Sequence, residues 1–182
     1  MVVHVVLVPD SKILQEVAGF KSVVILGCTY CANSSIAYEK NVPAYTMSVD
    51  KTTGRTTLLP IAMMEETNRL KNLLESKGIT VRVEMWPPLC ALTHEKELPT
   101  AMGGRQWADP ELANRCVDAE AVIALCCVGG MLGVKKRLGK DVKIIRGMKT
   151  VGLSQFYFTL DEAKEFVHVD KDKSTIIRTF KE

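Results

Sequence analysis

The chain contains no long hydrophobic run. Its first apolar stretch, Val2 to Val8, is interrupted by His4, ends at Pro9-Asp10 and has no basic residue before it. A membrane-spanning helix needs about 20 apolar residues. A secretory signal needs a basic start followed by an apolar segment. We therefore expect no membrane span, no membrane partner and a cytoplasmic location.

Concentrated charge and the common catalytic motifs are also missing. The net charge is only +3, and lysine and arginine are spread along the chain without a dense basic block, which argues against a nucleic-acid partner. There is no nucleophile elbow, Walker loop or zinc-protease helix motif, and the segment 129–133 does not match the GxGxxG pattern. We predict no nucleotide cofactor and assign no catalytic residue. An accessory or electron-transfer subunit fits the sequence better than a complete enzyme.

Length and composition indicate an ordinary globular domain. The chain has 182 residues, 47% of them hydrophobic, which is enough to bury a core without disulfide bonds. We expect a single α/β domain over 1–182, with a core at 1–150 and a C-terminal extension at 151–182. The cysteines are therefore not needed as staples.

Two uninterrupted apolar runs predict strands that are covered on both faces. Ser22 to Leu26 and Ala121 to Cys126 lack the alternation of a half-exposed strand, which is typical of a parallel sheet. Further strands are predicted at 2–8, 79–85 and 142–145, and helices at 11–18, 32–40, 60–77, 109–117 and 130–138. The alternation of strands and helices predicts a doubly wound, mostly parallel α/β sheet.

Three segments depart from this pattern. Residues 44–59 are rich in Thr and Val around a polar turn, which predicts a hairpin-like excursion. The segment 86–109 is long and rich in proline and glycine, and we expect it to fold over the carboxyl edge of the sheet. Beyond 151 we expect a small α+β tail. A helix starts at the capping box of Thr159 and Glu162, and the strands 167–169 and 174–180 pair across the polar turn at 170–173.

Five of the six cysteines follow predicted strands. Cys28 and Cys31 form a CxxC turn after the first buried strand, Cys126 and Cys127 end the second, and Cys90 lies a few residues beyond the strand at 79–85. The carboxyl ends of parallel strands lie at one edge of a sheet, where ligand sites collect. We therefore expect these thiols to converge in space.

Convergent thiols in a reduced compartment are better suited to metal binding or redox chemistry than to structural disulfides. Four sulfur ligands, from Cys28, Cys31, Cys90 and one of Cys126 and Cys127, fit a structural zinc ion or a [4Fe-4S] cluster. Strand alternation lets only one of the last two point into the site, and we favour Cys127, which is nearer the loop.

Two other candidate ligands have simpler explanations. Cys116 lies within a predicted helix among apolar residues, which indicates core packing. His94 shares a segment with Cys90, but its neighbours Thr93, Glu95, Lys96 and Glu97 are typical of a solvated stretch.

Two alternative functions use the same residues differently. In the first, Cys28 and Cys31 form the dithiol of a thiol oxidoreductase, with one sulfur as nucleophile and a neighbour that resolves it. In the second, the chain is a binding module whose thiols are incidental. Metal and sulfide analysis of anaerobically purified protein separates these two from the metal-binding hypothesis.

Three short stretches together resemble a known family. These are the CxxC turn at 27–31, the Asp-Pro-Glu-Leu start of a helix at 109–112, and the segment 118–129 that contains both Cys126 and Cys127. In this order they resemble the cysteine-rich C-terminal domain family of methylenetetrahydrofolate reductase partners, which belong to anaerobic one-carbon metabolism. The similarity spans about 22–150.

The resemblance implies a zinc or iron–sulfur site at Cys28, Cys31 and Cys126 or Cys127. It also implies a protein partner within a redox or one-carbon enzyme complex. The family tends to place a further cysteine just ahead of the Asp-Pro-Glu helix, where this chain has Trp107 and Ala108. Cys90 would have to substitute for it.

Overall fold

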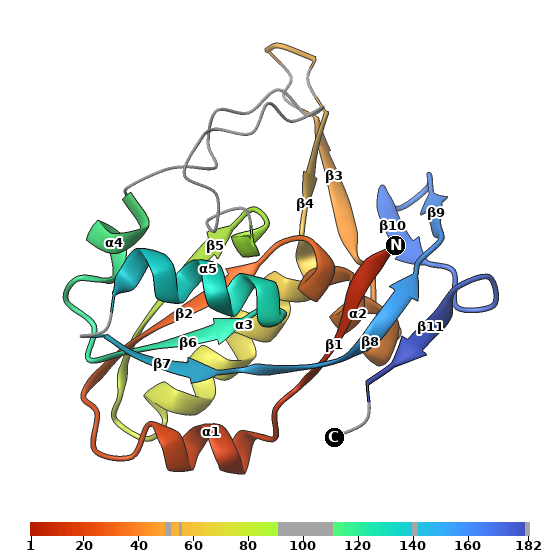
Figure 1. Cartoon of the computed structure of the whole chain (residues 1–182). Coiled ribbons are helices and arrows are strands. Elements are labelled where there is room, and N and C mark those ends of the chain that lie inside the picture. The colour runs from red at the N-terminus through yellow and green to blue at the C-terminus, as the bar shows by residue number, and fades with distance from the viewer. Residues whose placement is uncertain (50–51, 55, 91–110, 140–141, 181–182) are drawn as a thin grey trace.

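A parallel four-stranded sheet forms the centre of the molecule. The computed structural model describes residues 1–49, 52–54, 56–90, 111–139 and 142–180. The strands of this sheet are β2 (Ser22–Cys28), β5 (Thr80–Trp86), β6 (Ala121–Leu125) and β7 (Lys143–Arg146), in the order β5-β2-β6-β7. Strand β2 is thus flanked by a parallel neighbour on each side (Figure 1).

The two apolar runs of the sequence are the two inner strands of this sheet. Every residue of β6 is buried, as is every residue of β2 after Ser22, because helices cover both faces. On one face, Gly27 packs against Met63 of α3 (Ile61–Glu75). On the other, Gly130 of α5 (Val128–Leu138) packs against Cys126. The remaining helices are α1 (Asp10–Glu16), α2 (Cys31–Lys40) and α4 (Glu111–Cys116).

The prediction of one doubly wound, mostly parallel sheet is wrong, although the general α/β class is confirmed. The other strands form two antiparallel sheets. The first has the order β1-β8-β11, with β1 (Val2–Leu7), β8 (Met148–Gln155) and β11 (Thr175–Thr179). The second has the order β4-β3-β10-β9, with β3 (Tyr45–Val49), β4 (Thr56–Leu59), β9 (Phe158–Asp161) and β10 (Phe166–Val169).

The first strand explains part of this error. Val2 to Leu7 pairs with β8, from Val2 opposite Ser154 to Leu7 opposite Met148, and not with the parallel strands. His4 and Val5 are buried, and the other side chains of this strand are only partly buried. An apolar run predicts a strand, but it does not say which distant segment will supply the partner.

The C-terminal part of the chain forms strands where an α+β tail was expected. The capping-box pattern at Thr159 and Glu162 does not start a helix, because Phe158–Asp161 and Phe166–Val169 pair with each other and Glu165 turns the chain with a φ of 55°. Strand β10 also pairs with β3, and β11 pairs with β8. The predicted pairing of 167–169 with 174–180 is therefore also wrong, since tertiary pairing overrides the local pattern.

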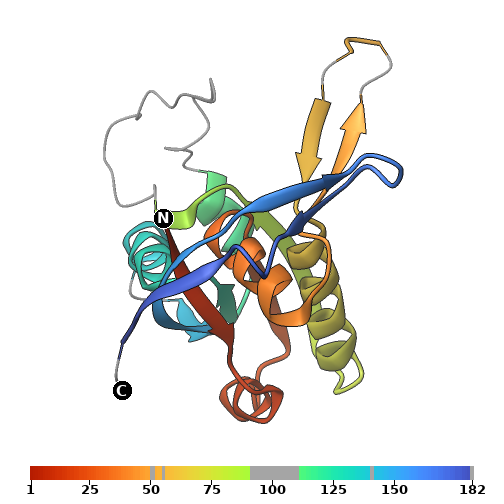
Figure 2. The ribbon, with the colours of Figure 1, turned by 90° about the vertical axis from the view of Figure 1, so that its right-hand side faces the viewer.

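The predicted hairpin at 44–59 is confirmed. Strands β3 and β4 pair antiparallel from Thr46 opposite Leu59 to Val49 opposite Thr56. The hairpin extends away from the parallel sheet and its helices (Figure 2). It is held at its base, where Val167 of β10 lies opposite Tyr45.

A buried carboxylate ties three helices together. Glu66 of α3 is almost inaccessible to solvent and forms ion pairs with Lys40 of α2 and with Arg69, at 2.7 Å from its guanidinium. Arg69 also forms a two-point ion pair with Asp10 of α1, with both N–O distances 2.8 Å. These hydrogen bonds lower the pKa of Asp10. The network fixes α1, α2 and α3 relative to one another.

Candidate functional site

Three neighbouring parallel strands deliver five cysteines to one edge of the sheet. Strand β2 ends at Cys28, and α2 begins at Cys31. Strand β5 ends at Trp86, opposite Cys28, and Cys90 follows four residues later. Strand β6 ends at Leu125, opposite Gly27, and is followed by Cys126 and Cys127. The register aligns the carboxyl ends of β2, β5 and β6 at one edge of the sheet (Figure 1), and all five cysteines lie at or just after these ends.

The five thiols influence one another electrostatically, which places them in one group. Cys28 interacts with Cys31 and Cys127, and Cys31 interacts with Cys127 and Cys90. Cys126 interacts with Cys28, Cys127 and Cys90. We call Cys28, Cys31, Cys90, Cys126 and Cys127 the thiol cluster.

Cys126 and Cys127 both belong to this cluster, although alternation in a strand would separate them. Strand β6 ends before them, and Cys127 is the N-terminal cap of α5 with φ −75° and ψ 174°. The chain therefore turns at this point, and the rule that successive side chains point to opposite faces no longer applies. Sequence reasoning treated the two cysteines as alternatives because it extended the strand through Cys126.

Two glycines at the start of α5 let the helix approach the cysteines. A Cβ atom at position 130 would lie 2.8 Å from the Cβ of Cys126 and 3.3 Å from the Cβ of Leu89. At position 129 it would lie 3.3 Å from the Cβ of Cys90 and 3.8 Å from the Sγ of Cys127. At position 130 only glycine lets the backbone come this close, whereas at position 129 a small shift of Cys90 would make room for a side chain.

The cluster has a buried part and an accessible part. Cys28, Cys126 and Cys127 are buried, Cys31 is half-buried and Cys90 is exposed. Burial raises the pKa of the Cys28 thiol to about 12 and that of Cys31 to about 11, and it raises the pKa of Cys126 well above its ordinary value. In the absence of a bound cation, Cys28, Cys31 and Cys126 are therefore neutral thiols at pH 7.

Backbone groups close to two of the sulfurs lower the pKa of the thiols. The backbones of Leu89 and Tyr30 act on Cys28, and that of Val3 in β1 acts on Cys31, although the effect of burial is larger. Backbone N–H groups beside a sulfur stabilise it when it carries negative charge, as in a metal-bound thiolate. The roles of Leu89 and Val3 were not predicted, because they depend on tertiary packing.

Asn33 fixes the helix that carries Cys31. Its side-chain amide donates to the carbonyl of Ala44 at 2.7 Å, and its amide oxygen accepts the N–H of Met63 at 2.8 Å. Asn33 is fully buried, so both bonds are protected from water. Together they join the start of α2 to β3 and α3. A buried Asn two residues after a CxxC motif is a signal that sequence reasoning did not use.

Tyr45 lies against the CxxC turn from the base of the hairpin. Its hydroxyl donates to the carbonyl of Thr29 at 3.5 Å. Burial raises the pKa of this hydroxyl, and Ser34, Asn33 and Cys31 are among the groups that act on it. The antiparallel sheet at β3 thus contributes a polar side chain beside the thiol cluster.

Cys116 lies apart from the thiol cluster. It is buried at the end of α4, and its charged neighbours are Glu84 and Arg82 of β5. Burial raises the pKa of its thiol to about 11. This environment agrees with the core-packing role expected for it. The other candidate, His94, lies outside the described residues, as does the loop expected over the site beyond Cys90.

Within the described ranges, no group of three or more His, Cys, Asp or Glu side chains has the arrangement needed to hold a metal ion. The thiol cluster therefore does not form a coordination sphere in this structure. Among the helices that the structure describes, none combines the length and apolar character needed to cross a membrane.

Comparison of the chain with protein-family models, curated proteins and solved structures found no match.

Proposed function

We propose that the thiol cluster binds an iron–sulfur cluster and that the protein is an accessory or electron-transfer component of a redox complex. The observation that carries this proposal is the convergence of five cysteines from three neighbouring strand ends. Thiolate sulfur is the ligand that iron–sulfur clusters use. The motif resemblance to partners of methylenetetrahydrofolate reductase supports a place in one-carbon metabolism.

The surroundings of the thiols fit such a group. Gly129 and Gly130 let the start of α5 pack directly beside the cysteines, and backbone groups near Cys28 and Cys31 lower the pKa of their thiols. A [4Fe-4S] cluster takes four thiolates, which Cys28, Cys31, Cys90 and one of Cys126 and Cys127 would supply. The bound group would supply one-electron chemistry.

The main alternative, a thiol oxidoreductase, is less well supported. A nucleophilic cysteine in such enzymes has a lowered pKa, so that thiolate is present at neutral pH. Here burial raises the pKa of Cys28 to about 12 and that of Cys31 to about 11. A metal offsets this cost, because a coordinating thiol loses its proton on binding. The same thiols are therefore poor nucleophiles and suitable ligands.

The proposal is tested by anaerobic purification followed by iron, zinc and acid-labile sulfide analysis and a visible spectrum. We expect about four iron and four sulfide per chain, as for a [4Fe-4S] cluster. Stoichiometric zinc without sulfide would show that the thiols hold a zinc ion and not an iron–sulfur cluster. Metal-free protein, even after anaerobic reconstitution with iron and sulfide, would refute metal binding and leave the thiol oxidoreductase or an incidental set of thiols.

A further inference from the structure

The helix that begins at the thiol cluster has an exposed face of unusual composition. Val128 and Leu132, one turn apart in α5, are 55% and 59% exposed. Lys135 and Lys136 follow on the next turn and are also exposed. These four positions lie within about 100° of one another around a helix that advances 100° per residue. The buried face of α5 carries Met131 and Val134 instead.

This face is continuous with the accessible side of the thiol cluster. Val128 directly follows Cys127, and the exposed Cys90 lies next to Gly129. The N–H of Val128 donates to the hydroxyl of Thr150 in β8 at 3.0 Å, which fixes the first turn of the helix. A protein that covered Val128 and Leu132 would therefore lie beside Cys90 and Cys127.

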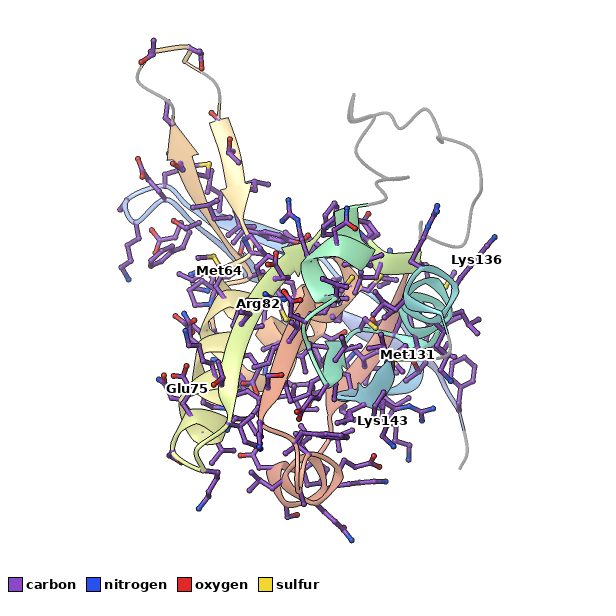
Figure 3. The ribbon with its side chains drawn as sticks, turned by 90° about the vertical axis from the view of Figure 1, so that its left-hand side faces the viewer. Met64, Glu75, Arg82, Met131, Lys136 and Lys143 are labelled. Atoms are coloured by element: carbon purple, nitrogen blue, oxygen red, sulfur yellow. The ribbon has the colours of Figure 1, made fainter. Side chains whose placement is uncertain are left out.

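The lysines beside Val128 and Leu132 indicate that a protein docking here is negatively charged. Lys135 and Lys136 lie at one end of this apolar pair, and Figure 3 shows the Lys136 side chain extending away from the body of the molecule. A small apolar centre with a charged rim is the usual anatomy of a protein–protein interface. A negatively charged partner would approach this rim fastest and bind best at low salt.

We propose that the exposed face of α5, formed by Val128, Leu132, Lys135 and Lys136, docks an acidic protein that exchanges one electron with the iron–sulfur cluster that the thiol cluster would hold. The electron-transfer part of this inference rests on the proposed function. The contact is small, as in weak electron-transfer complexes. Two aliphatic side chains on a helix of eleven residues are too few for a membrane anchor.

The docking surface is tested with a redox-inert acidic probe, a gallium-substituted ferredoxin. Titration of the ¹⁵N-labelled chain should shift the amides at and around 128–136, with affinity that falls as salt rises. The double variant Lys135→Glu/Lys136→Glu should weaken binding about tenfold or more, and Leu132→Ser should weaken it without changing its salt dependence. The matched double variant Lys12→Glu/Lys77→Glu changes the net charge equally, at exposed positions away from α5, and should bind within about twofold of the wild type.

Three results would overturn the inference. They are amide shifts centred elsewhere, an equal loss of binding in the Lys12/Lys77 control, and binding of basic cytochrome c as tight as that of the acidic probe. Vesicles containing phosphatidylglycerol provide a further comparison. If the wild type binds these vesicles tightly and the Lys135→Glu/Lys136→Glu variant does not, the surface recognises anionic lipid, and this result would also overturn the proposal of a protein partner.

The electron-transfer part is tested separately on iron-loaded protein. Reduction by dithionite, a small inorganic reductant, should proceed equally in the wild type and the Lys135→Glu/Lys136→Glu variant, whereas reduction by native reduced ferredoxin should be slower in the variant. Equal rates with ferredoxin would overturn the role in electron transfer. If the protein holds no iron, the proposed function fails, and the gallium-ferredoxin titration still decides whether the surface docks an acidic protein.

Discussion

Gly130 and Cys126 lie so close that a side chain at position 130 would place its Cβ 2.9 Å from the Cys126 sulfur. Cβ atoms essentially never approach other heavy atoms within 3.0 Å, so a larger residue forces either α5 or the cysteine to move. The spacing between α5 and the end of β6 is thus set by a glycine. This relationship gives the most direct structural test of the site.

We expect Gly130→Ala to destabilise the protein by roughly 1–3 kcal/mol through overpacking, partly offset by about 1 kcal/mol of gained helix propensity. Gly129→Ala in the same helix gains the same propensity and meets Cys90 less closely, at 3.3 Å. It should be neutral or slightly stabilising. Urea unfolding measures both, and equal effects of the two substitutions would contradict the close packing of Gly130.

Two cysteine substitutions should separate the site from the core. We expect Cys28→Ser to lose most of the bound metal, because Cys28 is buried at the end of β2 and interacts with Cys31, Cys126 and Cys127. Cys116→Ser should lose almost none, because its neighbours are Glu84 and Arg82. Plasma mass spectrometry on anaerobically purified protein measures both. Wild-type metal content in Cys28→Ser would eliminate Cys28 as a ligand.

Metal binding should strengthen as pH rises. Burial raises the pKa of Cys28 to about 12 and that of Cys31 to about 11, so each is protonated at neutral pH and must release a proton when it binds. The apparent association constant should rise about tenfold per pH unit for each proton released. Cobalt(II) titrations between pH 6.5 and 8.5, followed by thiolate charge-transfer absorption, measure this slope. A flat profile would mean that these thiols do not bind the metal.

The metal-free protein should lose stability at alkaline pH. A folded-state pKa of about 12 for Cys28, raised from the ordinary 9.0, favours the protonated thiol in the folded state. The contribution of the Cys28 thiol to the free energy of unfolding is fully present below pH 9, and it is lost as the pH rises through the folded-state pKa of about 12. The free energy of unfolding should therefore fall between pH 9 and 11. Cys28→Ala should show a shallower fall, and identical slopes would argue against a buried neutral thiol at this position.

Asn33 should be important for stability. Replacement by Ala leaves the Ala44 carbonyl and the Met63 N–H without their partner, at a cost of roughly 2–4 kcal/mol for two buried groups. The control Ser34→Ala removes a long contact of 3.3 Å to the Tyr30 carbonyl and an interaction with the Tyr45 hydroxyl. Neither loss leaves a buried backbone group unpaired, so the control should cost less than Asn33→Ala. Thermal unfolding of both variants compares them. A small effect at Asn33 would show that α2 is held mainly by its apolar contacts.

The elements that were predicted correctly are those whose pattern is local. Ser22 to Leu26 and Ala121 to Leu125 are apolar on both faces and proved to be the inner parallel strands. The hairpin at 44–59 has its own turn residues. The antiparallel sheet of β1, β8 and β11 could not be predicted, because its strands lie at opposite ends of the chain. At Thr159 a local helix signal was overridden by pairing between β9 and β10.

The candidate site was predictable to the extent that it depends on strand ends. The spacing of Cys28, Cys31, Cys90, Cys126 and Cys127 relative to the predicted strands indicated where the thiols would meet. The contacts that support them come from Leu89, Asn33 and Tyr45, whose roles depend on how separate elements pack. The joint participation of Cys126 and Cys127 depends on the point where β6 ends, and sequence patterns locate such boundaries poorly.

The contact between Val3 and Cys31 has a consequence for the order of events during protein synthesis. Val3 is held in place by β1, which pairs with β8 near the other end of the chain. The ribosome therefore releases the CxxC turn well before the strand that secures Val3 beside it. Contacts between such distant segments form late in folding. All the cysteines of the thiol cluster therefore emerge before β8, and a truncated chain that stops before β8 would carry them without the strand that secures Val3 beside Cys31.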